Sequence, residues 1–159
     1  MTPITPRRNH YALRAVFELA KHSGKGPTKI SDIADAQAIP VRFLEVILNR
    51  LKRSGLIDAK RGFYGGYYLT RPPAQITVAD VMTFMQGTEK PAACSACMAK
   101  SHCPHGARCA FSAMWNRVNR AVLQVYTETT IQDLLDTDRQ LHGKTGASRP
   151  RPLTMQQGR

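Results

Sequence analysis

One stretch of the sequence decides the fold: Val41-Arg-Phe-Leu-Glu-Val-Ile-Leu-Asn-Arg-Leu-Lys-Arg-Ser-Gly55. Its apolar residues recur at helical spacing, so that one face is apolar and the opposite face is largely polar and basic. The apolar face holds Leu44, Ile47, Leu48 and Leu51, and the polar face holds Arg42, Glu45, Asn49, Lys52 and Arg53. Gly55 is expected to end the helix, because a left-handed cap favours a residue without Cβ.

The residues before this helix predict two further helices. Residues 10–22 carry apolar side chains at helical spacing, and Thr28 is positioned to cap a second helix that contains Ile30 and Ile33. A break at Ala38-Ile39-Pro40 then leads into the helix that begins at Val41. Two helices joined by a tight break, the second of them basic outside, are typical of a helix-turn-helix that enters the major groove.

The residues after this helix predict a β-hairpin. A strand over 56–61 is followed by the turn Gly62-Phe-Tyr-Gly-Gly66 and by a second strand over 67–70. Lys60 and Arg61 lie at the base of this wing, where they can reach phosphates or the minor groove. We therefore expect a mainly α fold with a small β-hairpin wing, a winged helix-turn-helix followed by a long dimerisation helix.

The second half of the chain predicts three helices around a cysteine-rich loop. Capping boxes at Thr77–Asp80 and Thr130–Asp133 open short helices, which are expected to end at Gln86 and near Leu141. Between them, residues 110–126 form an amphipathic pattern that favours a helix at a subunit interface. The alternative is a helix folded back on its own winged domain.

These expected helices, strands and loops divide the chain into four units. Residues 1–75 form the DNA-binding domain, and 76–109 form a connecting helix with the cysteine loop. Residues 110–142 form the dimerisation helix and a short C-terminal helix. Residues 143–159 have the composition of a disordered basic tail.

All four cysteines fall within residues 94–109, at Cys94, Cys97, Cys103 and Cys109. Thiolates this dense are spaced to bind a soft metal or an iron-sulfur cluster. A structural zinc site formed by all four cysteines is an alternative, although the five residues between Cys103 and Cys109 are more than such sites usually have. A thiol redox switch is another, since Lys100 and Arg108 can stabilise thiolates.

Charge and hydropathy limit the class of protein. Residues 1–75 hold 13 Lys and Arg against 5 Asp and Glu, a net +8 within a total of +12, as expected of a protein whose first half lies against phosphates. No apolar run is long enough to span a membrane, and no secretory signal is evident. We expect a cytoplasmic protein with reduced thiols, which disfavours disulfides. No catalytic constellation is recognisable, so an enzyme is not expected.

Two residues are expected to read bases. Arg42 can form a bidentate contact with guanine N7 and O6, and Glu45 can accept a hydrogen bond from cytosine N4. The alternative is that Arg42 and Glu45 neutralise each other across one helical turn. Arg61 is the expected wing contact, and the cations expected to face phosphate or solvent are Arg50, Lys52, Arg53 and Lys60.

From residue 10 to residue 141 the chain resembles the cluster-binding winged-helix transcriptional regulators of the Rrf type, which include the isc-operon regulator and the nitric-oxide-sensitive repressor. The motifs that carry the resemblance are Tyr11-Ala-Leu-Arg-Ala, Phe43-Leu-Glu45, Leu51-Lys-Arg-Ser-Gly55-Leu, Arg61-Gly-Phe-Tyr-Gly-Gly-Tyr67 and Cys97-x5-Cys103-x5-Cys109. The resemblance implies a homodimeric regulator, such as a repressor, that binds a pseudo-palindromic operator in double-stranded DNA. It also implies one 2Fe-2S or 4Fe-4S cluster per subunit, which senses iron, nitric oxide or redox state.

By this resemblance the cluster ligands are Cys97, Cys103 and Cys109. The fourth ligand departs from the family pattern. Ser112 stands where the isc-type regulator has a histidine, and His10 stands where the nitric-oxide sensors have an aspartate that reaches the other subunit. His10 of the partner subunit and Cys94 are therefore alternative fourth ligands, with His102 and His105 as further candidates.

Overall fold

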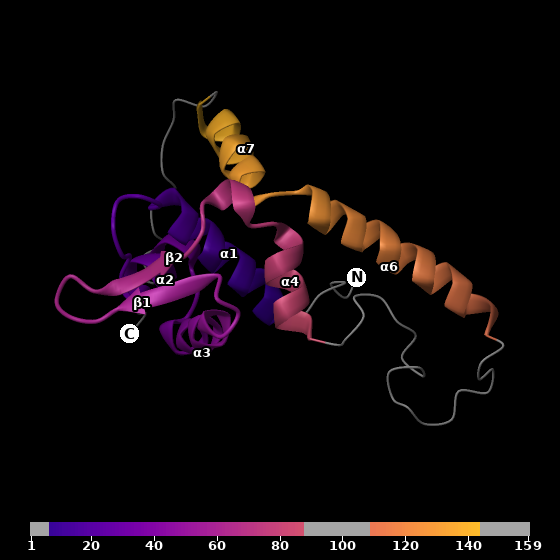
Figure 1. The fold of residues 1–159 in the computed structure, drawn as a ribbon, viewed down its shortest axis with the longest axis horizontal. Coiled ribbons are helices and arrows are strands. Elements are labelled where there is room, and N and C mark those ends of the chain that lie inside the picture. The colour runs from indigo at the N-terminus through magenta and orange to yellow at the C-terminus, as the bar shows by residue number, and fades with distance from the viewer. Residues whose placement is uncertain (1–6, 88–108, 144–159) are drawn as a thin grey trace, which may run out of the picture.

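The computed structural model describes residues 7–87 and 109–143, in which a two-stranded hairpin projects from one side of a group of helices (Figure 1). The helices are α1 (Arg7–Lys21), α2 (Ile30–Gln37), α3 (Val41–Lys52), α4 (Val78–Gln86), α6 (Ala110–Glu128) and α7 (Ile131–Gly143). The strands are β1 (Ile57–Lys60) and β2 (Gly66–Leu69), and a short 3-10 helix, η1 (Pro73–Gln75), follows them. The mainly α fold with a hairpin wing is confirmed.

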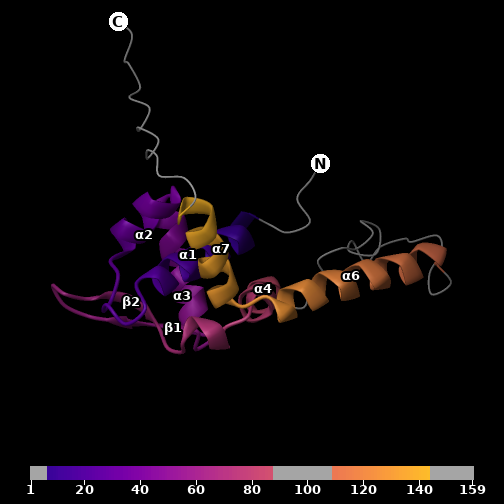
Figure 2. The same cartoon turned by 90° about the horizontal axis from the view of Figure 1, so that it is seen from above.

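Helix α1 lies at the centre of the fold. It packs against α2, α3, α4, α7 and β2, which surround it in Figures 1 and 2. The largest fully buried side chains come from many of these elements and include Leu19, Leu48, Ile57, Ile76 and Ile131. The helix begins at Arg7, three residues before the expected start at His10.

Helices α2 and α3 form the helix-turn-helix. Ala38, the residue after α2, adopts a left-handed conformation with φ 48°, and the Ile39 N–H donates to the Ala34 carbonyl at 2.9 Å. This turn redirects the chain into α3. The expected inner face of α3 is confirmed, because the buried residues of this helix are Leu44, Ile47, Leu48 and Leu51. The expectation that Gly55 caps α3 is wrong: the helix ends at Lys52 and Arg53 follows it in a right-handed conformation, while Gly55, with φ 73°, lies in the turn beyond.

The expectation that Thr28 caps α2 is wrong. The residue before α2 is Lys29, whose side chain makes no capping hydrogen bond. Thr28 instead pairs its backbone with Tyr67 of β2, with an N–H···O distance of 2.8 Å in each direction. A side-chain cap therefore gives way to a strand-like contact that attaches the base of the wing to the start of α2.

This attachment depends on Gly66. A Cβ at Gly66 would lie 2.4 Å from the Thr28 carbonyl oxygen, and its φ of 155° is unfavourable for other residues. We expect Gly66→Ala to destabilise the fold by about 1–3 kcal/mol, because the wing must move away from α2. Denaturant unfolding measures this effect. Gly143→Ala is the matched control, since no atom lies within 4 Å of a Cβ built there. Equal stabilities of the two variants would contradict the prediction.

The two expected capping boxes are confirmed, and they lie side by side. The Thr77 and Thr130 hydroxyls each accept from the N–H of the aspartate three residues later, Asp80 and Asp133, at 3.1 Å. A hydrogen bond from the Thr130 hydroxyl holds the pKa of Asp133 below its usual value. Thr77 and Thr130 also form a β-bridge, which brings the starts of α4 and α7 together.

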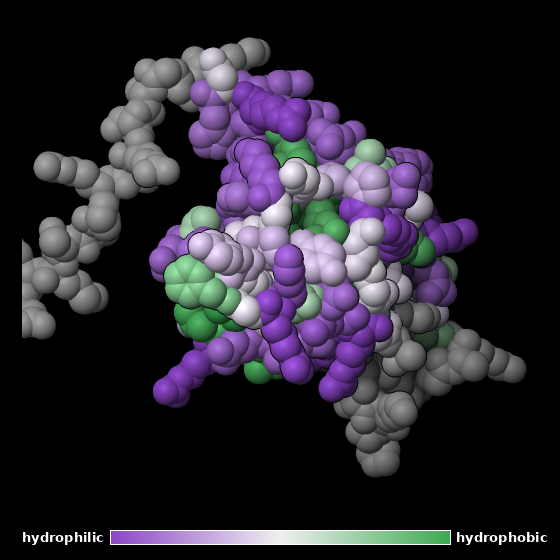
Figure 3. Space-filling model, turned by 60° about the vertical axis from the view of Figure 1, so that its left-hand side comes forward, coloured by the Kyte–Doolittle hydropathy of each residue, from purple (hydrophilic) through white to green (hydrophobic). Residues whose placement is uncertain are grey.

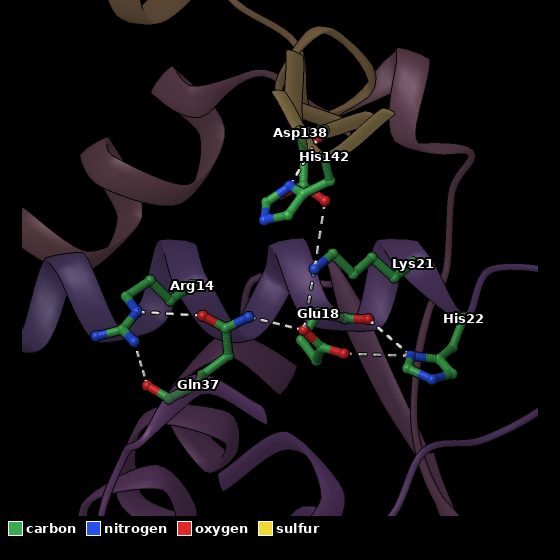
Figure 4. Close-up of polar contacts among 7 residues, drawn as sticks. All are labelled: Arg14, Glu18, Lys21, His22, Gln37, Asp138 and His142. Atoms are coloured by element: carbon green, nitrogen blue, oxygen red, sulfur yellow. Dashed lines mark hydrogen bonds and ion pairs between the residues drawn. The ribbon is translucent and has the colours of Figure 1, made fainter. Parts of the chain in front are cut away.

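A polar network joins α7 and α2 to α1 (Figure 4). The buried Glu18 carboxylate accepts from Gln37 Nε2 at 2.7 Å, and Gln37 Oε1 accepts from Arg14 Nε at 3.2 Å. Lys21 Nζ lies 3.8 Å from Glu18 and 3.5 Å from Asp138 of α7. The packing and this network bind the C-terminal helix to the winged helix-turn-helix.

Within residues 7–87 and 109–143, none of the helices combines the length and the apolar character needed to cross a membrane.

Candidate nucleic-acid interface and cysteine segment

The outer face of α3 is exposed along its whole length. Arg42, Glu45 and Asn49 are exposed, as are Lys52 and Arg53 at the end of the helix, whereas Arg50 is half-buried. Their backbone is held rigidly, because Leu44, Leu48 and Leu51 on the opposite face are fully buried. An exposed basic helix on a rigid support has the form needed to enter a major groove.

The expected base-reading pair is available to a ligand. Among the residues that the structure describes, Arg42 and Glu45 form no ion pair with each other. The alternative in which they neutralise each other therefore finds no support in this conformation. Lys52 differs, because its Nζ lies 3.8 Å from Asp58 Oδ1 of β1.

The wing presents both cations and aromatic rings. Lys60 and Arg61 are exposed, as expected for phosphate or groove contacts. Phe63 and Tyr64 at its tip are 81% and 84% exposed, and their rings meet edge to face at 5.0 Å. The face shown in Figure 3, on the wing side of the molecule, carries long hydrophilic side chains around small hydrophobic patches.

Sequence reasoning missed Lys29. Its Nζ lies 5.3 Å from the centre of the Phe63 ring, a cation–π geometry. Lys29, Lys60 and Phe63 line a groove of about 410 Å³ between the wing and the start of α2. The available signal was a basic residue directly after Thr28, at the start of α2. Lys29 therefore adds a cation to the surface of the wing.

Of the expected cluster ligands, the structure places Cys109 and His10. Cys109 is the half-buried residue directly before α6, where the N–H groups of the first turn favour the negative charge of a metal-bound thiolate. His10 is exposed on the first turns of α1. Cys94, Cys97 and Cys103 lie outside the described residues. Within the described ranges, no three His, Cys, Asp or Glu side chains are grouped to hold a metal.

Helix α6 extends away from the winged domain in both views (Figures 1 and 2). None of its residues is buried, and it contacts α4 at its domain-proximal end. Its apolar stripe includes Phe111 and Val125, which are 57% and 60% exposed. Partial burial raises the pKa of Tyr126, near the point where the helix joins the domain. The stripe is therefore exposed or half-buried within the described part of a single chain, and none of it enters a core.

Several known proteins are similar to this chain in sequence and in fold. The model of the Rrf2 family, described as "Iron-dependent Transcriptional regulator", matches residues 5–137. The HTH-type transcriptional regulator IscR of Xenorhabdus nematophila is 30% identical over 128 residues, 80% of this chain and 76% of that protein.

Two solved structures are similar over most of their length. CymR (YrzC), the global cysteine regulator of B. subtilis, has a TM-score of 0.69 and 31% identity, covering 84% of this chain and 96% of that one. IscR of T. potens has a TM-score of 0.69 and 26% identity, covering 92% and 93%. These relatives are regulators and not enzymes. The chain is a transcriptional regulator and belongs to the Rrf2 family.

Proposed function

We propose that this regulator is a cytoplasmic homodimer that binds double-stranded DNA through α3 and the wing, and that an iron-sulfur cluster controls this binding. The exposed basic face of α3, with Arg42 and Glu45 unpaired with each other, is the observation that carries the proposal. Arg42 and Glu45 read base edges in the major groove. Arg61 contacts the minor groove or the backbone, and the cations that lie along phosphates are Arg50, Lys52, Arg53 and Lys60.

The homodimer forms through α6. The apolar stripe of this helix, none of which is fully buried, runs over seven residues at three- and four-residue steps: Phe111, Met114, Trp115, Val118, Val122, Val125 and Tyr126. Pairing two such stripes removes this apolar surface from water. A two-fold dimer presents two copies of α3, which suits a pseudo-palindromic operator with half-sites about one helical turn apart.

The cluster is held by Cys97, Cys103 and Cys109, with His10 of the partner subunit or Cys94 as the fourth ligand. The position of Cys109 fits such a group, because its thiolate lies at the N-terminus of α6. Bound there, a 2Fe-2S or 4Fe-4S cluster supplies a centre that responds to iron supply, nitric oxide or redox state.

Cys109 also connects the proposed cluster to DNA binding. A restraint on Cys109 is a restraint on the first turn of α6, and α6 contacts α4, which packs on α1. Helix α1 in turn packs directly on α3. Loss of the ligand bonds therefore changes the relative position of the two copies of α3, and operator affinity with it.

Iron, sulfide and zinc content, measured with the visible spectrum of anaerobically purified protein, tests the proposal. Iron and sulfide in matching amounts with a charge-transfer band would support the cluster. Zinc without sulfide in a colourless protein would make the segment a structural site and overturn the sensing part.

A thiol switch is the second candidate, favoured by the likeness to the global cysteine regulator CymR. In this case the cysteines act without metal, and Cys109 changes the start of α6 when it is oxidised. The metal analysis separates the candidates when it is combined with a DNA-binding assay. A thiol switch requires protein that lacks iron and zinc and whose DNA affinity changes with oxidant.

The wing contact can be tested separately. We expect Arg61→Ala to weaken operator binding by about 1–3 kcal/mol, because a groove contact is lost while the fold is unchanged. Fluorescence anisotropy with labelled operator DNA measures the change. Arg139→Ala, an exposed arginine of α7, is the matched control. Equal operator affinities of the two variants would show that Arg61 makes no groove contact.

A further inference from the structure

Val46 lies in the middle of the polar face of α3. It is 70% exposed, more than Phe43 at 64% or Val41 at 41%, while its neighbours Ile47 and Leu48 are buried. We propose that Val46 is a specificity-determining residue that contacts the C5-methyl group of thymine in the major groove. This inference rests on the proposed role of α3 in DNA binding.

The position of Val46 follows from helical geometry. At 3.6 residues per turn, residues four apart lie one above the other on the same face. Val46 therefore lies one turn after Arg42 and one turn before Asn49 and Arg50, with Arg53 a further turn on. Its neighbours on this face include the hydrogen-bond donors Arg42, Asn49 and Arg50 and the exposed Phe43, and Val46 is not part of the hydrophobic core.

The chemistry of thymine matches this arrangement. Among the four bases of unmodified DNA, thymine alone presents an apolar group at the major-groove edge. Valine presents two methyl groups and has restricted χ1 rotation, so it loses little side-chain entropy on contact. A buried methyl–methyl contact removes apolar surface from water without leaving a hydrogen-bonding group unpaired.

Charge complementarity selects DNA as the occupant of this face. The apolar side chains of α3 that remain exposed are separated by Arg42 and Glu45 and bordered by Lys52 and Arg53. An apolar protein partner would have to bury these charges at considerable cost. A nucleic-acid groove instead places phosphates beside the cations and base edges beside Val46.

The contact has a defined place in the operator. Four helical residues span about 6 Å along the helix axis, which corresponds to about two base steps of 3.4 Å. The thymine read by Val46 should therefore lie within about two base pairs of the guanine read by Arg42, once in each half-site.

The test begins by selecting operators for the full-length protein from a random DNA library. Each thymine of the selected site is then replaced by deoxyuridine, which removes only the C5-methyl group, and affinity is measured by fluorescence anisotropy. We expect one uracil per half-site to weaken wild-type binding by about four- to tenfold, and Val46→Ala to remove this sensitivity. Val41→Ala is the matched control and should keep it.

A further arm distinguishes the source of the methyl group. Cytosine at the sensitive position should bind weakly, and 5-methylcytosine should recover part of the affinity. If 5-methylcytosine binds better than thymine, methylated cytosine is the ligand and the assignment to thymine is overturned. Sequence-specific binding without a uracil effect, or an effect that persists in Val46→Ala, would also overturn it. Failure to select any sequence would instead contradict the proposed function itself.

Discussion

Cys103→Ala protein should purify with less than about a tenth of the iron and sulfide of the wild type, because the proposed cluster would lose one of its three thiolate ligands. The fold should persist, since the core formed by the described residues contains no cysteine. Iron and sulfide analysis of anaerobically purified protein measures the loss, and far-ultraviolet circular dichroism measures helix content.

Two further variants test which residue is the fourth ligand. Cys94→Ala removes the same chemical group from the same segment, and His10→Ala removes the imidazole at the start of α1. The variant that destabilises the cluster identifies the fourth ligand, and the other serves as the matched control. Stoichiometric iron in Cys103→Ala protein would show that the assignment of the three ligands is wrong.

Val122→Glu should convert the protein into a monomer. Val122 is a half-buried residue of the apolar stripe of α6, so a carboxylate there would be buried without a partner in a dimer formed through this stripe. The expected loss is about 3 kcal/mol or more, which raises the dimer dissociation constant over a hundredfold. Analytical ultracentrifugation should then give the 17.7 kDa of a single chain in place of twice that mass.

Arg120→Glu is the matched control for Val122→Glu. Arg120 is exposed on the same helix, and the helical repeat places it on the side opposite the stripe. This variant introduces the same carboxylate and should remain dimeric. A Val122→Glu protein that keeps the mass of a dimer would exclude α6 as the interface.

Local patterns made much of the fold predictable from the sequence. The periodicity of Leu44, Ile47, Leu48 and Leu51 predicts α3 and its buried face, and the structure confirms both. Reciprocal bonds within four residues define the capping boxes, so Thr77–Asp80 and Thr130–Asp133 were predictable without knowledge of the rest of the chain.

Contacts between distant residues were not predictable in this way. Thr28 has the side chain of a helix cap, but its pairing with Tyr67 depends on a hairpin that begins almost thirty residues later. The docking of α7 on α1 likewise depends on Ile131 and Leu135, whose spacing reveals an apolar face but not what covers it. Periodicity identifies a buried face, whereas the identity of its partner is a property of the tertiary structure.

The position of α7 affects how the protein is made. Ile131 is fully buried in the same core as Leu19 and Leu48, so the core of the winged helix-turn-helix is incomplete until residue 131 has left the ribosome. All four cysteines precede that residue in synthesis order. All four cysteines of a nascent chain therefore leave the ribosome before its hydrophobic core can form.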